Sequence, residues 1–584
     1  MKIFKKPLFY LLPLLAAVYS TIMISSRMEI MNVKITRNNK TENITLPYAT
    51  DMAKDEVFFV SFSLLVKENK SVKLNIIPDD CLQEVLINGE QFSLEGIKGL
   101  CDYSGGAYLD FSKYVREGLN NFEIRIINSG GGKGGLHINQ YYNGLKDVSL
   151  IQYIFAFLLL LSAILILAKL KFNLIAISII VLGITVRLIL YTYTAPTQNT
   201  YDIWGHLEYV QIVAEEKRLP KTAECWSCNH PPLYYIVSAV AKNVADGYDF
   251  TLTNRIQQQG QMILSIICVV LGMALLINLF GNRKITYLTA LILTLWPHLV
   301  IASPRIGNDV PFYFGALFCM LFAQRYWRLC KNSDMLLASI GASIALAAKS
   351  TGFVILGAWA IIYIFNILRL LKVSSLRVLL ASIFIIAISI VLSYHRPIAD
   401  FIYKNDVRLA NATNVNSGLK IKNTAGSYFS FDMHDYLFEP YTSTWADRGG
   451  RQHFWNFALK TSLFGEFSVW NSPAGHTIAT LLNILVLFIF MLALWGIIHV
   501  HLRELPPLLF LVSLFASLIF IRAWYSLSCM SDVRYILPVV FPLVYFSGRG
   551  IQILENSRLR KLSYASMLAF AVLSFAFIVG QAFA

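Results

Sequence analysis

The stretch that decides the topology of this chain runs from Pro231 to Val244 and reads PPLYYIVSAVAKNV. It is apolar enough to resemble a membrane span, but it has only about 14 residues, and a helix needs about 20 to cross a bilayer. Its proline pair suits a helix N-terminus, and Lys242 lies near its end. As a span it would also place Arg283, Lys284 and every later basic loop on the wrong side of the membrane. We therefore predict a juxtamembrane helix here.

The composition indicates a membrane protein. The 584 residues are 56% hydrophobic and 15% charged, whereas about one quarter of a soluble protein is charged. The formal net charge of +15 could indicate a nucleic-acid partner, but the Lys and Arg residues concentrate in short loops at alternate ends of apolar runs. No basic stripe with interleaved aromatic residues remains, so no nucleic-acid partner is expected. The basic loops contain Lys169, Lys171, Arg283, Lys284, Arg325, Arg328, Lys331, Arg369, Lys372, Arg377, Arg558, Arg560 and Lys561.

About thirteen apolar segments predict a polytopic α-helical membrane protein. The first, in residues 1–26, is predicted to be a membrane anchor and not a cleaved signal peptide, because no small-residue cleavage site follows it. With the N-terminus inside, the loops 194–256 and 395–475 lie outside and the basic loops lie inside. The helical domain then covers residues 149–584, and its apolar segments begin near residues 150, 173, 257, 285, 311, 334, 351, 377, 478, 507, 535 and 563.

Residues 27–148 differ in composition and are predicted to form an extracytoplasmic antiparallel β-sandwich. Asn88-Gly89 has the residues of a tight hairpin turn. The glycine-rich run 130–135 is predicted to be a sandwich loop and not a phosphate-binding loop, because no Ser or Thr follows Lys133. The predicted strands are 33–36, 58–66, 72–77, 84–87, 107–111 and 122–127. The stretches 86–89, 109–112 and 118–122 resemble the galactose-binding-like jelly-roll modules that are attached to many carbohydrate enzymes.

Two cysteine pairs lie in regions predicted to be exported. Cys81 and Cys101 belong to the sandwich, and Cys225 and Cys228 belong to the next outer loop. We predict a disulfide in each pair, because exported proteins meet an oxidising compartment. The alternative for the second pair is a metal site with His230, although this gives three ligands where zinc usually has four.

The outer loops gather acidic, imidazole and basic side chains. Asp202, His206 and Tyr209 are spaced i, i+4, i+7, so a helix would place them on one face above the membrane. Each candidate also has a plain structural role: an Asp can cap a helix, and a Lys can extend to the lipid headgroups. The other candidates in these loops are Glu208, His230, Arg305, Asp309, Lys349, Glu466 and Arg534.

The order and shared side of these motifs resemble the C-type membrane glycosyltransferases (GT-C), which include protein O-mannosyltransferases and the lipid A aminoarabinose transferase. The resemblance covers residues 173–545. It implies a GT-C-like helical fold and the transfer of a sugar from a polyprenyl-phosphate donor to a glycan, lipid or protein acceptor. The motifs that carry it are Asp202-x3-His206, the stretch from His230 to Tyr235, Asp309, Lys349, and the stretch from Arg534 to Pro538.

The resemblance also implies roles for individual residues. Asp202 would be the general base, with Asp309 as a second catalytic carboxylate, because a positioned carboxylate can take the acceptor's proton. Cations would hold the donor phosphate as its negative charge grows. The implied phosphate ligands are Lys349, Arg305 and Arg534, and the implied acceptor or metal ligands are His206, His230, Glu208 and Glu466. A divalent metal is left open, and no other cofactor is expected.

Three other functions stay open: a lipid-linked glycan polymerase or ligase, a transporter or flippase of lipid-linked sugars, and a carbohydrate-binding scaffold. A transporter would carry polar residues at mid-membrane depth, whereas this chain concentrates them at one face. The aromatic-rich segment 395–475 is expected to be an acceptor-binding lid. We expect a bacterial inner membrane, with the site facing the periplasm.

Overall fold

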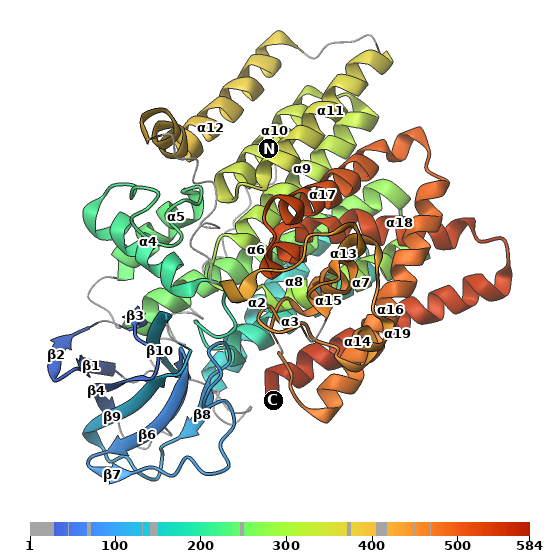
Figure 1. Ribbon diagram of the computed structural model, residues 1–584. Helices are drawn as coiled ribbons and strands as arrows, with labels where there is room; N and C mark the ends of the chain where they lie inside the picture. Colours follow the sequence, from blue (N-terminus) through green and yellow to red (C-terminus); the bar gives the residue numbers. More distant parts are fainter. Residues whose placement is uncertain are drawn as a thin grey trace.

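The chain folds into a β-sandwich, drawn in shades of blue in Figure 1, and a larger helical domain, drawn in cyan to red. This computed structural model describes residues 29–44, 46–66, 72–130, 132–140, 150–245, 250–370, 375–404, 417–447, 450–467 and 469–583. The predicted anchor, residues 1–26, lies outside these ranges.

The sandwich consists of two antiparallel sheets with the strand orders β2-β1-β4-β9-β6-β7 and β3-β10-β5-β8. Each of the six predicted strands is confirmed. So is the hairpin, in which Asn88 and Gly89 have the positive φ angles of 53° and 86° that a two-residue turn requires. The strands are β1 (Glu29–Arg37), β2 (Lys40–Asn43), β3 (Tyr48–Met52), β4 (Glu56–Val66), β5 (Lys73–Pro78), β6 (Cys81–Ile87), β7 (Glu90–Gln91), β8 (Ala107–Asp110), β9 (Gly118–Asn128) and β10 (Gly132–Gln140).

The core of the sandwich follows from alternation along its strands. In β9 every second side chain from Asn120 to Asn128 is buried, as the two-residue period of a strand requires. Phe62 of β4 stacks on Phe122 of β9 with ring centroids 5.0 Å apart, and the second sheet closes the core with Ile76 of β5 and Ile138 of β10. The sandwich therefore has its own hydrophobic core.

The part of the glycine-rich run from Gly132 to Gly135 was wrongly predicted to be a loop. Residues from Gly132 to Gly135 form the first half of β10, which pairs with β3. A Cβ atom on Gly135 would lie 2.3 Å from the carbonyl oxygen of Tyr48, so the glycine lets the two strands approach. Periodicity could not detect this half of the strand, because glycines have no side chains with which to mark alternating faces, whereas Leu136 and Ile138 in the second half do alternate.

The helical domain contains every apolar segment predicted from residue 150 onward. Among the described residues, eight helices are long and apolar enough to cross a membrane, so the predicted count of about thirteen is not confirmed. The helices α7 and α10 have only 11 and 17 residues. The helices are α2 (Leu150–Lys169), α3 (Leu174–Tyr193), α4 (Ile203–Glu216), α5 (Leu233–Ala245), α6 (Phe250–Phe280), α7 (Lys284–Thr294), α8 (Pro297–Ile301), α9 (Asp309–Leu329), α10 (Asn332–Ala348), α11 (Gly352–Leu370), α12 (Leu376–Lys404), α13 (Ala425–Phe429), α14 (Met433–Phe438), α15 (Phe454–Phe464), α16 (Pro473–Ile498), α17 (Leu505–Trp524), α18 (Val540–Ile553) and α19 (Ser557–Phe583).

The stretch that was expected to be a short juxtamembrane helix forms α5, which has 13 residues and is not among the candidate spans. It packs against α4 outside the main helix bundle (Figure 1). Tyr235 is fully buried against α4, whereas Val237 and Val240 are about 60% exposed (62% and 60%). An apolar face of this kind is typical of a helix that lies on lipid.

One predicted span is broken. The segment from residue 285 divides into α7 and α8, and Pro297 stands in the first turn of α8. Arg187 of α3 is 2% exposed and donates hydrogen bonds to the Ser265 hydroxyl (2.8 Å) and to the carbonyl oxygen of Thr294 (3.2 Å), which ends α7. This buried arginine therefore satisfies a carbonyl that the helix break exposes.

The segment predicted as the outer loop 395–475 is largely helical in its described parts. Helix α12 continues to Lys404, and α16 begins at Pro473. Between them α15 is buried, and it is tied to α8 by hydrogen bonds from Trp296 to the Ser462 carbonyl oxygen (2.6 Å) and between His298 Nδ1 and the Thr461 carbonyl oxygen (2.6 Å). This part of the segment is a packed wall of the helical domain.

The packing of α9 against α10 depends on glycines. A Cβ atom on Gly315 of α9 would lie 2.4 Å from the backbone nitrogen of Ala345, and one on Gly341 of α10 would lie 2.5 Å from that of Cys319. Small residues at such positions let helix backbones approach closely in a membrane.

Gly315→Ala should therefore lower the unfolding temperature of the detergent-solubilised protein. Forcing an extra methyl group into a packed interface costs about 1–3 kcal/mol. Gly357→Ala in α11 is the matched control, because no atom lies within 4 Å of its Cβ position. Equal unfolding temperatures for the two variants would show that the close crossing is not needed for stability.

Candidate active site

A cavity in the helical domain collects side chains that lie far apart in the sequence. Its volume open to water-sized molecules is about 50 Å³. Two predicted candidates lie elsewhere: Glu466 is partly buried beside Tyr201, and Glu208 is exposed on α4. The predicted residues in the cavity wall are Asp202, His206, His230, Arg305, Asp309, Lys349 and Arg534.

Asp202 has an unusual backbone conformation. Its φ and ψ angles of 48° and 35° are left-handed, which costs energy for a residue other than glycine and is often found at functional sites. Its side chain makes no capping hydrogen bond to α4; instead the indole N–H of Trp226 donates to Oδ1 (3.1 Å). The side chain of Asp202 therefore does not act as an ordinary helix cap.

His206 lies one helical turn after Asp202 and also faces the cavity. Its Nδ1 is 2.8 Å from the hydroxyl of Tyr235, and its ring lies 6.0 Å from that of His230. Burial lowers the pKa of His206 to about 4, and burial together with the neighbouring His206 and Lys349 lowers that of His230 to about 3. Both imidazoles are therefore neutral near pH 7 and can donate or accept hydrogen bonds there.

Lys349 and Asp309 form an ion pair across the cavity wall. Asp309 begins α9, where the helix dipole favours a negative charge, and Lys349 follows the last residue of α10. The Lys349 ammonium is also 4.7 Å from the ring centroid of Tyr535. Lys349 is 6% exposed, so it does not extend to lipid headgroups.

Arg534 is the second cation of the cavity. Its guanidinium carbon lies 3.6 Å from the ring centroid of Tyr201, which is a stacking distance, and one N–H donates to the hydroxyl of Tyr535 (3.1 Å). Its Nε is 3.7 Å from a carboxylate oxygen of Asp532, which is fully buried. This acid and the two aromatic rings hold the guanidinium against the cavity.

Arg305 is the third cation, and it lacks a polar partner. The residue is 6% exposed, and none of its three guanidinium nitrogens has a hydrogen-bond acceptor in the described part of the chain. The group lies between Tyr201 and Phe467, with ring centroids 5.0 and 5.3 Å away. Burying a charge without a partner costs free energy, and a bound ligand of opposite charge would offset that cost. Arg305 is therefore suited to bind an anion in the cavity.

Glu466 is the acid whose charge interacts with both Arg534 and Arg305. Burial raises the pKa of its carboxyl group to about 8, even though Arg534 and Arg305 lower it. The carboxyl group is therefore mainly neutral near pH 7. The other acids near the three cations are Asp202 and Asp309, which line the cavity, and Asp532, which is fully buried beside Arg534.

Two residues of the site were not predicted. Asp532 stands two positions before Arg534, and an acid inside an apolar segment is a signal that reasoning from the sequence could have used. His298 lines the cavity next to the proline that begins α8. Its position depends on the helix break, which hydropathy alone did not reveal.

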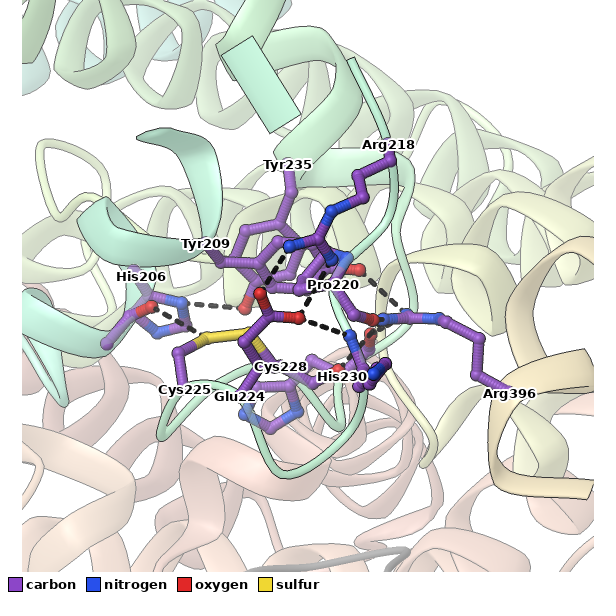
Figure 2. Close-up of a disulfide and its surroundings, with 12 residues drawn as sticks. His206, Tyr209, Arg218, Pro220, Glu224, Cys225, Cys228, His230, Tyr235 and Arg396 are labelled. Atoms are coloured by element: carbon purple, nitrogen blue, oxygen red, sulfur yellow. Dashed lines mark hydrogen bonds and ion pairs between the residues drawn. A yellow bond between two sulfur atoms is a disulfide. The ribbon is translucent and has the colours of Figure 1, made fainter. Parts of the chain in front are cut away.

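The loop between α4 and α5 is held by a disulfide and by an arginine from α12 (Figure 2). Cys225 and Cys228 are bonded to each other, as Cys81 and Cys101 are in the sandwich. Arg396 donates to the carbonyl oxygens of Pro220 (2.7 Å), Cys228 (3.0 Å) and His230 (3.2 Å), and to the Tyr209 hydroxyl (2.7 Å). This arginine therefore fixes the loop that carries Trp226 and His230.

The described residues contain no group of three or more His, Cys, Asp and Glu side chains that could hold a metal ion. The cysteines that were candidate ligands form the Cys225–Cys228 disulfide, which removes both thiolates. The residues present in these ranges do not fit a divalent metal site.

Fold and site together define a polytopic membrane protein with a cationic cavity next to its β-sandwich. Residues 232–400 match the family described as dolichyl-phosphate-mannose-protein mannosyltransferase. The match confirms, for this segment, the resemblance expected from the sequence. The segment includes Arg305, Asp309 and Lys349, whereas Asp202 and Arg534 lie outside it. No curated protein matches the chain by sequence.

Solved structures with a similar arrangement are distant. One is ArnT from Cupriavidus metallidurans bound to undecaprenyl phosphate, with a TM-score of 0.42 and 13% identity over 69% of this chain and 76% of that chain. Another is the arabinosyltransferase EmbB from Mycobacterium smegmatis, with a TM-score of 0.41 and 11% sequence identity over 97% of this chain and 59% of that chain. A third is the oligosaccharyltransferase AglB from Archaeoglobus fulgidus in complex with an inhibitory peptide and a dolichol-phosphate. Its TM-score is 0.39 and its sequence identity 11%, over 70% of this chain and 55% of that chain. At these scores no residue role transfers to this chain.

Removing one partner of the Asp309–Lys349 pair should destabilise the protein more than removing both. Asp309→Leu or Lys349→Met alone leaves a buried charge unpaired, which costs about 3–5 kcal/mol. Unfolding of the two single variants and of the double variant in detergent gives the coupling energy. Strictly additive effects would show that the pair does not stabilise the site.

Proposed function

We propose that this protein is a glycosyltransferase that moves a sugar from a polyprenyl-phosphate donor to an acceptor, with Asp202 as general base. The observation that carries the proposal is the unpartnered guanidinium of Arg305 in a cavity that Asp202 also lines. A phosphate is the anion that such a group binds well, because its oxygens match the planar N–H donors. The family match over residues 232–400 supports a lipid-phosphate sugar donor.

The reaction needs a proton acceptor and a place for negative charge. The acceptor hydroxyl transfers its proton to Asp202 while its oxygen bonds to the anomeric carbon of the donor sugar. The bond from that carbon to the phosphate oxygen breaks, and the polyprenyl phosphate leaves with the electron pair and one more negative charge. Arg305, Lys349 and Arg534 surround the place where this charge develops, so they stabilise the transition state more than the donor.

We place the protein in a bacterial inner membrane with the cavity facing the periplasm. The basic residues of the short loops support this orientation. The two disulfides support an oxidising compartment on the side of the sandwich.

Asp202→Asn should lower the turnover number about 10²- to 10⁴-fold, the usual contribution of a general base. The assay follows radiolabelled sugar from polyprenyl-phosphate donors into acceptors of membranes that contain the protein. Arg305→Gln should instead weaken binding of polyprenyl phosphate, and Glu215→Gln, which changes an exposed acid of α4, should leave both quantities unchanged. Undiminished transfer by Asp202→Asn would exclude the proposed base.

Donor affinity should also depend on the charge of Glu466. Its raised pKa means that the carboxyl group is neutral below about pH 8 and ionises above it. Ionisation adds a negative charge beside the phosphate site, so the affinity of wild type for polyprenyl phosphate should fall as the pH rises from 7 to 9.5.

Glu466→Gln keeps the neutral state and should remove most of this fall. Burial also lowers the pKa of Lys349, so loss of the lysine charge is a competing cause of weaker binding at high pH. An equal fall in Glu466→Gln and wild type would assign the effect to a group other than Glu466.

A further inference from the structure

The sandwich contacts the chain directly before the proposed base. The backbone N–H of Asn199 donates to the carbonyl oxygen of Ser104 (2.8 Å) in a sandwich loop. Nearby, the Asn139 side chain of β10 donates to the Thr197 hydroxyl (2.7 Å), and both residues are buried. Asp202 follows Asn199 by three positions, so the sandwich helps to fix the segment that carries it.

The contacting loop, Cys101 to Gly106, is rigidly held. Its first residue is joined to β6 by the disulfide with Cys81. Asp102 Oδ1 accepts hydrogen bonds from the backbone N–H groups of Ser104 (2.9 Å) and Gly105 (3.0 Å), and the Asn75 side chain donates to the Gly105 carbonyl oxygen (2.8 Å). Most backbone groups at the tip of this loop therefore have partners already.

Tyr103 projects from this loop toward the helical domain. Its hydroxyl is hydrogen-bonded to the side chain of Trp445, which comes from the segment between α14 and α15. Burial raises the pKa of Tyr103 to about 12, and the negative charge of Glu466 contributes to this rise. Both aromatic residues are 49% exposed, so much of each ring is open to a ligand.

We propose that Tyr103 and Trp445 form a carbohydrate-binding contact of the acceptor site, so that the sandwich supplies part of that site. The inference rests on the proposed function, because it assigns an acceptor class to the same reaction. Aromatic rings with a polar edge suit a ligand that has both apolar C–H faces and hydroxyl groups.

The backbone hydrogen bonds of this loop favour a sugar over a peptide as the ligand. An extended peptide binds by pairing its main chain with free N–H and C=O groups at a sheet edge. In the loop Cys101 to Gly106, the N–H groups of Ser104 and Gly105 and both of their carbonyl oxygens are already used. The rings of Tyr103 and Trp445 are therefore the groups of this contact that remain available to a ligand, and their apolar faces suit a sugar.

The test is binding of the full-length protein in nanodiscs to arrays of defined oligosaccharides and of Ser/Thr-containing peptides, without donor. Wild type should bind at least one oligosaccharide, and Tyr103→Ala or Trp445→Ala should weaken that binding at least tenfold. Tyr103→Phe keeps the ring and should retain most of it. Phe59→Ala is the matched control, because Phe59 contacts Arg125 on the six-stranded sheet.

Unchanged oligosaccharide binding by Tyr103→Ala would overturn the inference, as would a wild type that binds no oligosaccharide. Tyr103-dependent binding of a peptide would also overturn it and would assign a protein acceptor. Because the array needs neither donor nor catalysis, its outcome is independent of the Asp202→Asn assay. In the transfer assay Tyr103→Ala should raise the KM for acceptor and leave the affinity for polyprenyl phosphate unchanged.

Discussion

The ion pair between Asp309 and Lys349 joins the start of α9 to the end of α10, inside the cavity wall. The same two helices cross in backbone contact at Gly315 and Gly341, where a Cβ atom would not fit. The pair uses one of the three cations of the site, while Asp532 stands beside another. What remains is Arg305, whose guanidinium nitrogens have no hydrogen-bond acceptor in the described part of the chain. The proposed binding of an anion thus depends on how the charges of the cavity are paired where these helices pack.

Much of the fold could be predicted because its signals are local. Alternation gave six of the strands, and the Asn88-Gly89 turn follows from the φ angles that those residues tolerate. Apolar runs located the helices, and the short length of α5 kept it out of the candidate spans. The number of spans could not be counted in this way, because α7 and α10 are apolar yet shorter than a bilayer requires.

The candidate site was predictable in its members but not in its geometry. Asp202, Asp309 and Lys349 stand out as polar residues beside apolar runs, and the structure brings them to one cavity. The left-handed backbone of Asp202 and the missing partner of Arg305 depend on tertiary packing, which no local pattern encodes. His298 was missed because its partner, the Thr461 carbonyl oxygen, is distant in sequence, whereas Asp532, two positions before Arg534, was detectable as an acid inside an apolar segment.

The hydrogen bond from Asn199 to Ser104 joins parts of the chain that leave the ribosome at different times. The sandwich is synthesised before the loop that carries Asp202, and Arg534 follows more than three hundred residues later. Domains generally fold as units, with the N-terminal one first. The sandwich is therefore a template against which the later loop takes its shape. A chain with a misfolded sandwich would lose the hydrogen bonds that hold the segment before Asp202.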